Sequence, residues 1–124
     1  MNIVLWILQV LLGLAFLAAG IMKATQPLDK LSKQMDWVAV TPPALTRFIG
    51  IAEILGGIGL ILPAVTGIAT WLTPVAAAGL ALIMLLAVGF HLRRSDPTNR
   101  IVPGLVLFVL ALVVAVGRGF VEKL

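Results

Sequence analysis

The chain alternates long apolar stretches with short charged ones. Residues 1–22 contain no Asp, Glu, Lys or Arg, and neither do the 39 residues from Ile54 to Leu92. A helix of ~20 apolar residues is long enough to cross a bilayer, whereas 39 residues would form a helix of about 58 Å. The second stretch must therefore contain a break between two helices.

Proline and glycine positions locate this break. Pro63, Gly67 and the pair Thr73-Pro74 lie inside the long apolar stretch. Proline favours the first turn of a helix, and a preceding threonine can cap it. A second Thr-Pro pair stands at residues 41–42, and Pro103 lies early in the last apolar stretch.

Four membrane spans follow from this pattern. No segment alternates with the period of two that is typical of a strand, so the fold class is all-α, an integral membrane four-helix bundle forming one domain over residues 1–124. A secretory signal peptide would carry Lys or Arg before its apolar part. None is present here, so we expect the first stretch to be retained. The predicted spans are residues 3–22, 43–62, 74–91 and 101–117.

The connection between the first two spans has a pattern of its own. Apolar residues recur at helical spacing among charged ones, at Leu28, Leu31, Met35 and Val38. This predicts a short amphipathic interfacial helix that starts at Pro27 and lies along the membrane surface, with Trp37 at the depth of the headgroups. Two roles are open for this segment: a simple tether between the spans, or a gating or docking element.

Composition supports the membrane class and limits the chemistry. Hydrophobic residues make up 61% of the chain and charged ones 11%, with a mean hydropathy of +1.17, whereas soluble domains are about one quarter charged. The chain has no cysteine and one histidine. Thiol chemistry is therefore excluded, and a metal site of three or four protein ligands is disfavoured. We expect no intrinsic cofactor and no enzymatic activity of the chain on its own.

Basic residues set the predicted orientation. With four spans, the termini and the 63–73 turn share one side of the membrane, and only two Lys and Arg residues, Arg118 and Lys123, belong to it. The other seven lie in the two remaining connections and their flanks. Cytoplasmic loops carry the excess of positive charge, which predicts both termini outside. Because the basic residues flank apolar spans, the net charge of +4 does not indicate nucleic-acid binding.

Small residues form stripes at helical spacing. In lipid, helices associate through close backbone approach, so the stripes are expected to face neighbouring helices, either within one bundle or at the seam of a homodimer. The stripes are Ala15 with Ala19, Ala52 with Gly56, and Ala111 with Ala115 and Gly119.

Glu53 is the most informative residue. It lies ten positions after Pro43, ~15 Å along a regular helix, and a carboxylate at that depth is costly unless paired, hydrated or protonated. We therefore expect Glu53 to face the bundle interior. A structural ion pair with Lys23 and a ligand-binding or proton-handling role are both open.

The partners for Glu53 are expected at the cytoplasmic helix ends. Lys23 ends the first span and His91 the third, so both can extend inward; His91 can instead cap its own helix. Arg47 lies six residues before Glu53, about 240° around the helix, and would have to act through another helix or water. Gln9 is expected to line the same cavity from the outer side. We expect Lys23 and Glu53 to be coupled and to shape a polar pocket that opens toward the cytoplasm.

Four segments carry a resemblance to a known family. They read AGIMKATQP at 19–27, RFIGIAEILGGIGLILP at 47–63, LTPVAAAGLALIML at 72–85 and HLRR at 91–94. Together they resemble the DoxX-like family from about residue 5 to 117. The most specific part combines the Lys23 segment with Arg47, Gly50, Glu53, Gly56 and Pro63.

This resemblance implies a four-span bundle in bacterial cytoplasmic membranes. Relatives include membrane components of thiosulfate:quinone or detoxifying oxidoreductase assemblies and a chaperone for receptor assembly. Lys23, Glu53 and His91 fall where the family's polar intramembrane cluster would be. Three functions remain open: a non-catalytic subunit that binds a quinone or lipid and supports an oxidoreductase partner, an assembly or chaperone module, and a small proton-coupled transporter.

Overall fold

The computed structural model describes residues 2–35, 38 and 41–124, and this part of the chain is helical without any strand. Four helices are long and apolar enough to cross a membrane, which agrees with the predicted all-α class. They are α1 (Asn2–Thr25), α3 (Pro43–Thr66), α4 (Leu72–Arg93) and α5 (Thr98–Val116), the last continued by the π-helical turn η2 (Gly117–Val121). A short helix, α2 (Leu28–Gln34), lies between α1 and α3.

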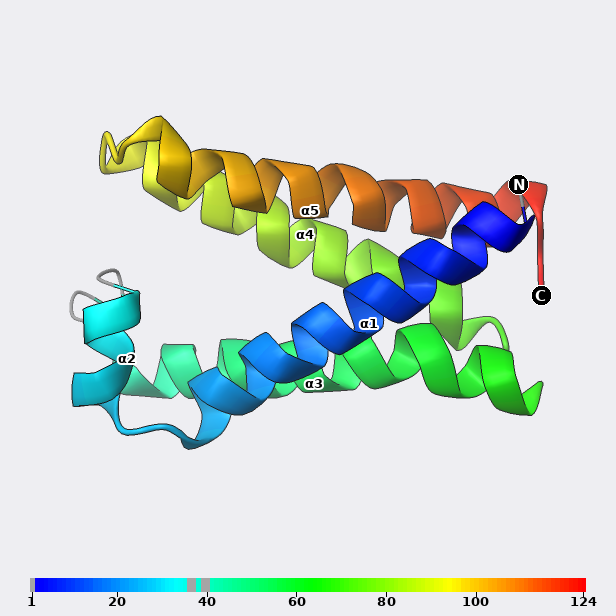
Figure 1. The fold of residues 1–124 in the computed structure, drawn as a ribbon, viewed down its shortest axis with the longest axis horizontal. Coiled ribbons are helices and arrows are strands. Elements are labelled where there is room, and N and C mark those ends of the chain that lie inside the picture. The colour runs from blue at the N-terminus through cyan, green and yellow to red at the C-terminus, as the bar shows by residue number, and fades with distance from the viewer. Residues whose placement is uncertain (1, 36–37, 39–40) are drawn as a thin grey trace.

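The long helices form two packed pairs, α1 with α3 and α4 with α5. α1 starts beside α5, at the end of the bundle that holds both termini, and finishes beside α3 (Figure 1). α4 starts near α3 and finishes beside α5, so the two pairs diverge toward the end that holds α2 and the α4–α5 turn (Figure 1). The termini therefore share one end, as four spans require.

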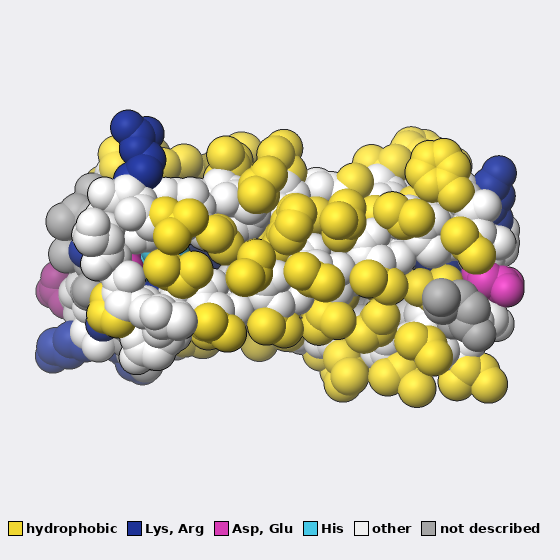
Figure 2. All heavy atoms as spheres, turned by 90° about the horizontal axis from the view of Figure 1, so that it is seen from above, with side chains coloured by type: hydrophobic (Ala, Val, Ile, Leu, Met, Phe, Trp, Pro, Cys, Tyr) yellow, Lys and Arg dark blue, Asp and Glu magenta, His cyan; other side chains and the backbone are white. Residues whose placement is uncertain are grey.

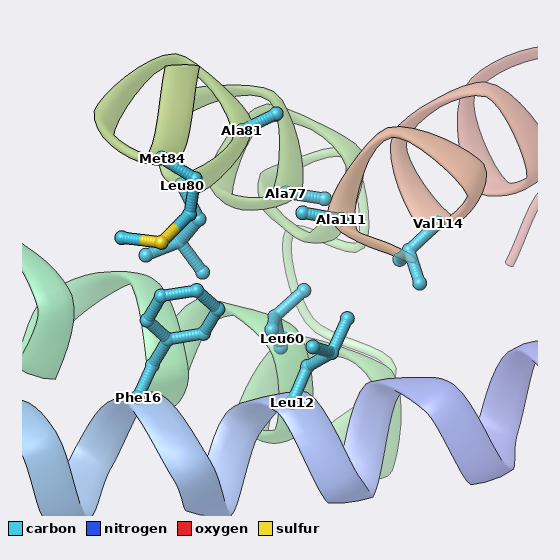
Figure 3. Close-up of a cluster of buried hydrophobic side chains, with 9 residues drawn as sticks. All are labelled: Leu12, Phe16, Leu60, Ala77, Leu80, Ala81, Met84, Ala111 and Val114. Atoms are coloured by element: carbon cyan, nitrogen blue, oxygen red, sulfur yellow. The ribbon is translucent and has the colours of Figure 1, made fainter. Parts of the chain in front are cut away.

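The surface and the core both suit a lipid environment. On the face drawn in Figure 2, apolar side chains cover the middle of the molecule, and charged ones lie at its two ends. The buried cluster draws on all four long helices (Figure 3), which lets it hold both pairs together. Its members are Leu12, Phe16, Leu60, Ala77, Leu80, Ala81, Met84, Ala111 and Val114.

Glycines bring α1 and α3 into backbone contact. A Cβ atom added to Gly50 would lie 2.7 Å from the backbone nitrogen of Ala24 and 2.8 Å from the carbonyl oxygen of Gly20. Farther along the pair, a Cβ on Gly57 would lie 2.8 Å from the carbonyl oxygen of Gly13. Neither position can take a side chain without moving a helix, so these glycines set the distance between α1 and α3.

The predicted small-residue stripes face other helices of the same bundle only in part. Ala15 is exposed, because α1 turns Gly13 and Gly20 toward α3 instead. The other stripes do meet neighbouring helices: a Cβ on Gly56 would lie 2.6 Å from Leu80 of α4, and Ala111 belongs to the buried cluster.

The helix break lies within the predicted 63–73 stretch, at Gly67 and not at Pro63. α3 continues through Pro63 to Thr66 and ends at Gly67, whose φ of 71° is left-handed. Proline has no N–H to donate to the carbonyl four residues before it, here that of Gly59. The hydroxyl of Thr73 donates to this carbonyl at 2.9 Å. Thr73 thus supplies a hydrogen bond that Pro63 leaves unmade in α3, and does not cap α4. Pro63 therefore destabilises α3 less than a proline inside a helix normally does.

The remaining predicted bounds shift by a few residues. α1 and α4 run farther than expected, to Thr25 and Arg93, and α5 begins at Thr98, so Pro103 lies inside it. The fourth span reaches Val121 through η2.

The short connecting helix exists, and it lies crosswise to the long helices at the end of the bundle (Figure 1). Leu31, on its apolar side, is fully buried within the protein. A position at the membrane surface stays a prediction. Trp37 lies outside the described residues.

Candidate functional site

An ion pair joins α1 and α3 inside the bundle. Lys23 Nζ donates to Glu53 Oε1 at 2.7 Å, and the side chains are 12% and 1% exposed. Glu53 shares its helix face with Gly50 and Gly57, three residues before it and four after it, and this face packs on α1. The predicted interior position of Glu53 and its contact with Lys23 are therefore confirmed.

Arg47 binds the backbone of Lys23, one member of this pair. Its Nη1 donates to the backbone carbonyl of Lys23 at 2.9 Å, and so satisfies one of the carbonyls that the last turn of α1 leaves free. Arg47 therefore acts on the Lys23 backbone and not on the Glu53 carboxylate. This arrangement agrees with the sequence, which places Arg47 on a different side of the helix from Glu53 and so disfavours a direct pair.

Among the described residues, three buried polar atoms on the segments that carry this pair have no hydrogen-bond partner: Glu53 Oε2, Thr46 Oγ1 and Gln26 Oε1. Thr46 lies seven residues before Glu53 on the same face of α3, and Gln26 follows Lys23 by three residues. Buried polar atoms normally find partners. Unmatched hydrogen-bonding capacity is therefore present on the pair itself and on nearby residues of the same two segments. Thr46 and Gln26 were not singled out from the sequence, where a threonine near a helix start and a glutamine near a helix end are ordinary.

His91 has a different partner from the one expected. Its Nδ1 lies 2.6 Å from Asp96 Oδ2, in the turn between α4 and α5, and Arg94 Nη1 lies 3.7 Å from the same oxygen. The hydrogen bond with His91, followed by the nearby positive charge of Arg94, holds the pKa of Asp96 below its usual value. His91 thus closes the turn and makes no bond to Glu53, because α4 and α5 diverge from α1 and α3 here (Figure 1).

Gln9 belongs to a second polar cluster, at the end that holds the termini. Its Nε2 donates to the Leu60 carbonyl at 2.9 Å, and its Oε1 accepts from Arg118 Nε at 2.6 Å. Fourteen residues of α1 separate Gln9 from Lys23, ~21 Å along the helix. Gln9 therefore does not line the space around Glu53.

Arg118 is a further buried polar residue that the sequence did not predict. It is 3% exposed, and its Nη1 donates to Asn2 Oδ1 at 2.7 Å and to the Glu122 carbonyl at 2.9 Å. Its guanidinium also stacks over the Trp6 ring, 5.6 Å from the centroid. The sequence offers one signal, an arginine between Gly117 and Gly119 directly after an apolar span, and this signal equally fits a residue at the membrane boundary.

An apolar groove runs between α3 and α4 on the outer side of the bundle. It has a volume of about 480 Å³. Small residues of both helices form much of its floor: Ala52, Gly56, Gly59, Ala76 and Gly79. Such a surface can take an apolar chain or another helix.

Within the described part of the chain, no group of three or more His, Cys, Asp or Glu side chains could hold a metal ion. The geometry offers instead a buried ion pair with unmatched polar atoms around it. Comparison with curated proteins and with solved structures gives no match. The profile of the DoxX-like family matches residues 7–115. This match covers α3, α4 and the Lys23–Glu53 pair in full, and the chain belongs to the DoxX-like family.

Proposed function

We propose that this protein is a non-catalytic component of a bacterial cytoplasmic membrane system for redox or detoxification chemistry. In this proposal it binds a quinone-like amphipathic molecule at the Lys23–Glu53 pair and presents it to a separate oxidoreductase. Both termini lie outside, because the end of the bundle with α2 and the α4–α5 turn has the excess of Lys and Arg.

The observation that carries the proposal is the half-satisfied Glu53 carboxylate. Oε1 accepts from Lys23, whereas buried Oε2 has no partner. Ionisable residues inside a membrane protein are functional by default, and an unsatisfied buried acceptor costs free energy that a bound donor recovers. A hydroquinone hydroxyl can donate to Oε2, and the ammonium group of Lys23 can donate to a quinone carbonyl.

The surroundings of the pair suit this type of ligand. Thr46 adds an unmatched hydroxyl on the same face of α3 as Glu53, and Lys23 keeps 12% of its side chain exposed. We expect a polar pocket to open from here toward the cytoplasm. Electrons have to come from the partner, since the chain has no cysteine and no redox step is assigned to its own residues.

Quinone binding by the purified full-length protein tests the proposal. We expect a short-chain ubiquinone added to the protein in detergent to raise its unfolding temperature. Glu53→Gln keeps the shape but reduces the acceptor strength of Oε2, and should weaken binding about tenfold. Lys33→Gln, a charge change at an exposed site of α2, should leave the affinity unchanged.

Thr46→Val provides a second variant if Glu53→Gln does not fold. Equal affinity of the wild type and both site variants would refute the proposal. If quinone fails to bind and protonation of Glu53 instead follows a transmembrane proton gradient, the transporter function replaces it.

The α3–α4 groove favours a second candidate, an assembly module that holds a membrane helix of another protein or of a second copy. Close helix packing in lipid needs small residues, and the groove presents five of them. Gly79 lies in this groove with nothing within 4 Å of an added Cβ. A large side chain at this position would fill the groove without disturbing the bundle.

Gly79→Leu and Gly89→Leu form a matched pair for this second candidate. Both glycines lie on α4 with open space at the Cβ position, but Gly89 does not line the groove. If the groove holds a helix, Gly79→Leu should reduce co-purification of the partner or dimerisation, and Gly89→Leu should not. Equal behaviour of the two variants would remove the groove from the function.

A further inference from the structure

The end of the bundle with the termini holds a buried positive charge that forms no salt bridge with the described residues, and the Glu122 carboxylate acts on it only from beyond 4 Å. Arg118 is 3% exposed, and its hydrogen-bond acceptors are two side-chain amides and one backbone carbonyl, all of them neutral. Glu122 contributes its carbonyl and forms no salt bridge with Arg118. Among the described residues, no carboxylate oxygen lies within 4 Å of the guanidinium.

One nitrogen of this guanidinium also has no hydrogen-bond partner. Arg118 Nη2 is buried and unmatched, although Nε and Nη1 are both used. The Trp6 ring under the guanidinium offers a favourable π face, but it is neutral. A buried cation without an anion in contact is costly, and a negatively charged ligand that reaches the guanidinium would lower this cost.

An open pocket of about 300 Å³ adjoins Arg118. Lys123 lines it and adds a second positive charge, and Trp71, 64% exposed, lies on its other side. Tryptophan is enriched at headgroup depth in membranes. The pocket therefore combines two cations with an aromatic residue at the end of the spans, where lipid phosphates lie.

We propose that this pocket binds a phosphate group, and specifically the headgroup of an anionic phospholipid from the leaflet on the side of the termini. The phosphate oxygens accept from Arg118 Nη2 and pair with Lys123, while the acyl chains remain along the apolar surface of the spans. Arginine suits this role because its planar donors match phosphate oxygens. The site is separate from the Lys23–Glu53 pair and does not depend on the function proposed for it.

Native mass spectrometry of the full-length protein tests this site. In neutral detergent with equal amounts of phosphatidylglycerol and phosphatidylcholine, we expect retention of one phosphatidylglycerol, bound about tenfold more tightly. Lys123→Gln should remove most of this preference, and Arg118→Gln should remove all of it. Lys33→Gln, the same charge change at the opposite end, should have no effect.

The lysine variant keeps the test decisive if Arg118→Gln does not fold. Equal retention of the two lipids, or an unchanged preference in Lys123→Gln, would overturn the proposal. Inorganic phosphate separates the two sources of the anion. If millimolar phosphate stabilises the protein and displaces phosphatidylglycerol, the ligand is a free anion and the headgroup assignment is wrong. If phosphate has neither effect, the headgroup assignment is supported.

Discussion

At the end of the bundle with α2, Lys23 meets a carboxylate, whereas at the end with the termini Arg118 meets only neutral acceptors. Both cations are mostly buried and both contact α1 or belong to it. At the first end the charge is balanced and one carboxylate oxygen is left over. At the second, the cation has no anion in contact.

The two unmatched sites therefore favour ligands of opposite hydrogen-bonding character. Glu53 Oε2 is an acceptor that requires a hydrogen-bond donor, while Arg118 Nη2 is a donor that requires an acceptor, preferably an anion. The cost of breaking each site should follow the same distinction. Removing one member of an ion pair leaves a bare charge, whereas removing a neutral partner leaves a hydrogen bond unmade.

The largest effect is expected from breaking the ion pair. Lys23→Met leaves the Glu53 charge unpaired and should destabilise the bundle by ~3–5 kcal/mol. Adding Glu53→Gln should recover much of this loss. Unfolding in detergent of both single variants and the double variant measures the coupling, and strictly additive effects would show that the two residues do not interact.

A smaller loss is expected at the opposite end. Gln9→Leu removes the acceptor of Arg118 Nε and the donor to the Leu60 carbonyl, and should cost ~1–3 kcal/mol because Arg118 keeps its other two acceptors. Asn99→Leu, at an exposed amide, is the control. A loss as large as that of Lys23→Met would contradict the distinction between the two ends.

The hydrogen bond from Thr73 to the Gly59 carbonyl should contribute still less to stability. Thr73→Val removes the hydroxyl that donates to the Gly59 carbonyl, and should lower the free energy of unfolding by ~0.5–1.5 kcal/mol. Thr25→Val, which removes an exposed hydroxyl bonded within its own helix, should cost less. Equal losses in the two unfolding experiments would mean that the proline gap needs no repair.

The smallest effect concerns pH at the α4–α5 turn. The pKa of Asp96 is lowered in the folded protein, mainly by its hydrogen bond with His91. Its contribution to stability is therefore complete above its unfolded pKa of about 3.9 and is lost as the pH falls through the lower folded value. Unfolding temperatures from about pH 5 to about pH 2 should fall less steeply in Asp96→Asn than in the wild type. A steeper fall would contradict the assignment, and Asp29→Asn is the control.

The sequence by itself determined the four apolar helices, the shared side of the termini and the interior position of Glu53. These features follow from local chemistry, because the length of an apolar stretch and the cost of a buried carboxylate depend on few neighbours. The contact between Lys23 and Glu53 was predictable for the same reason: Glu53 needed a counter-charge, and Lys23 lies in the last turn of the first span.

Only the tertiary structure decided which helices are partners and which polar groups are left unmatched. The glycine contacts of α1 with α3, the donation from Thr73 to Gly59 and the burial of Arg118 each join residues far apart in the chain. Arg118 followed an apolar span, where basic residues usually mark the membrane boundary. Its burial depends on Gln9 and Asn2, which lie more than a hundred residues away in the sequence. A local sequence pattern cannot predict contacts between residues so far apart.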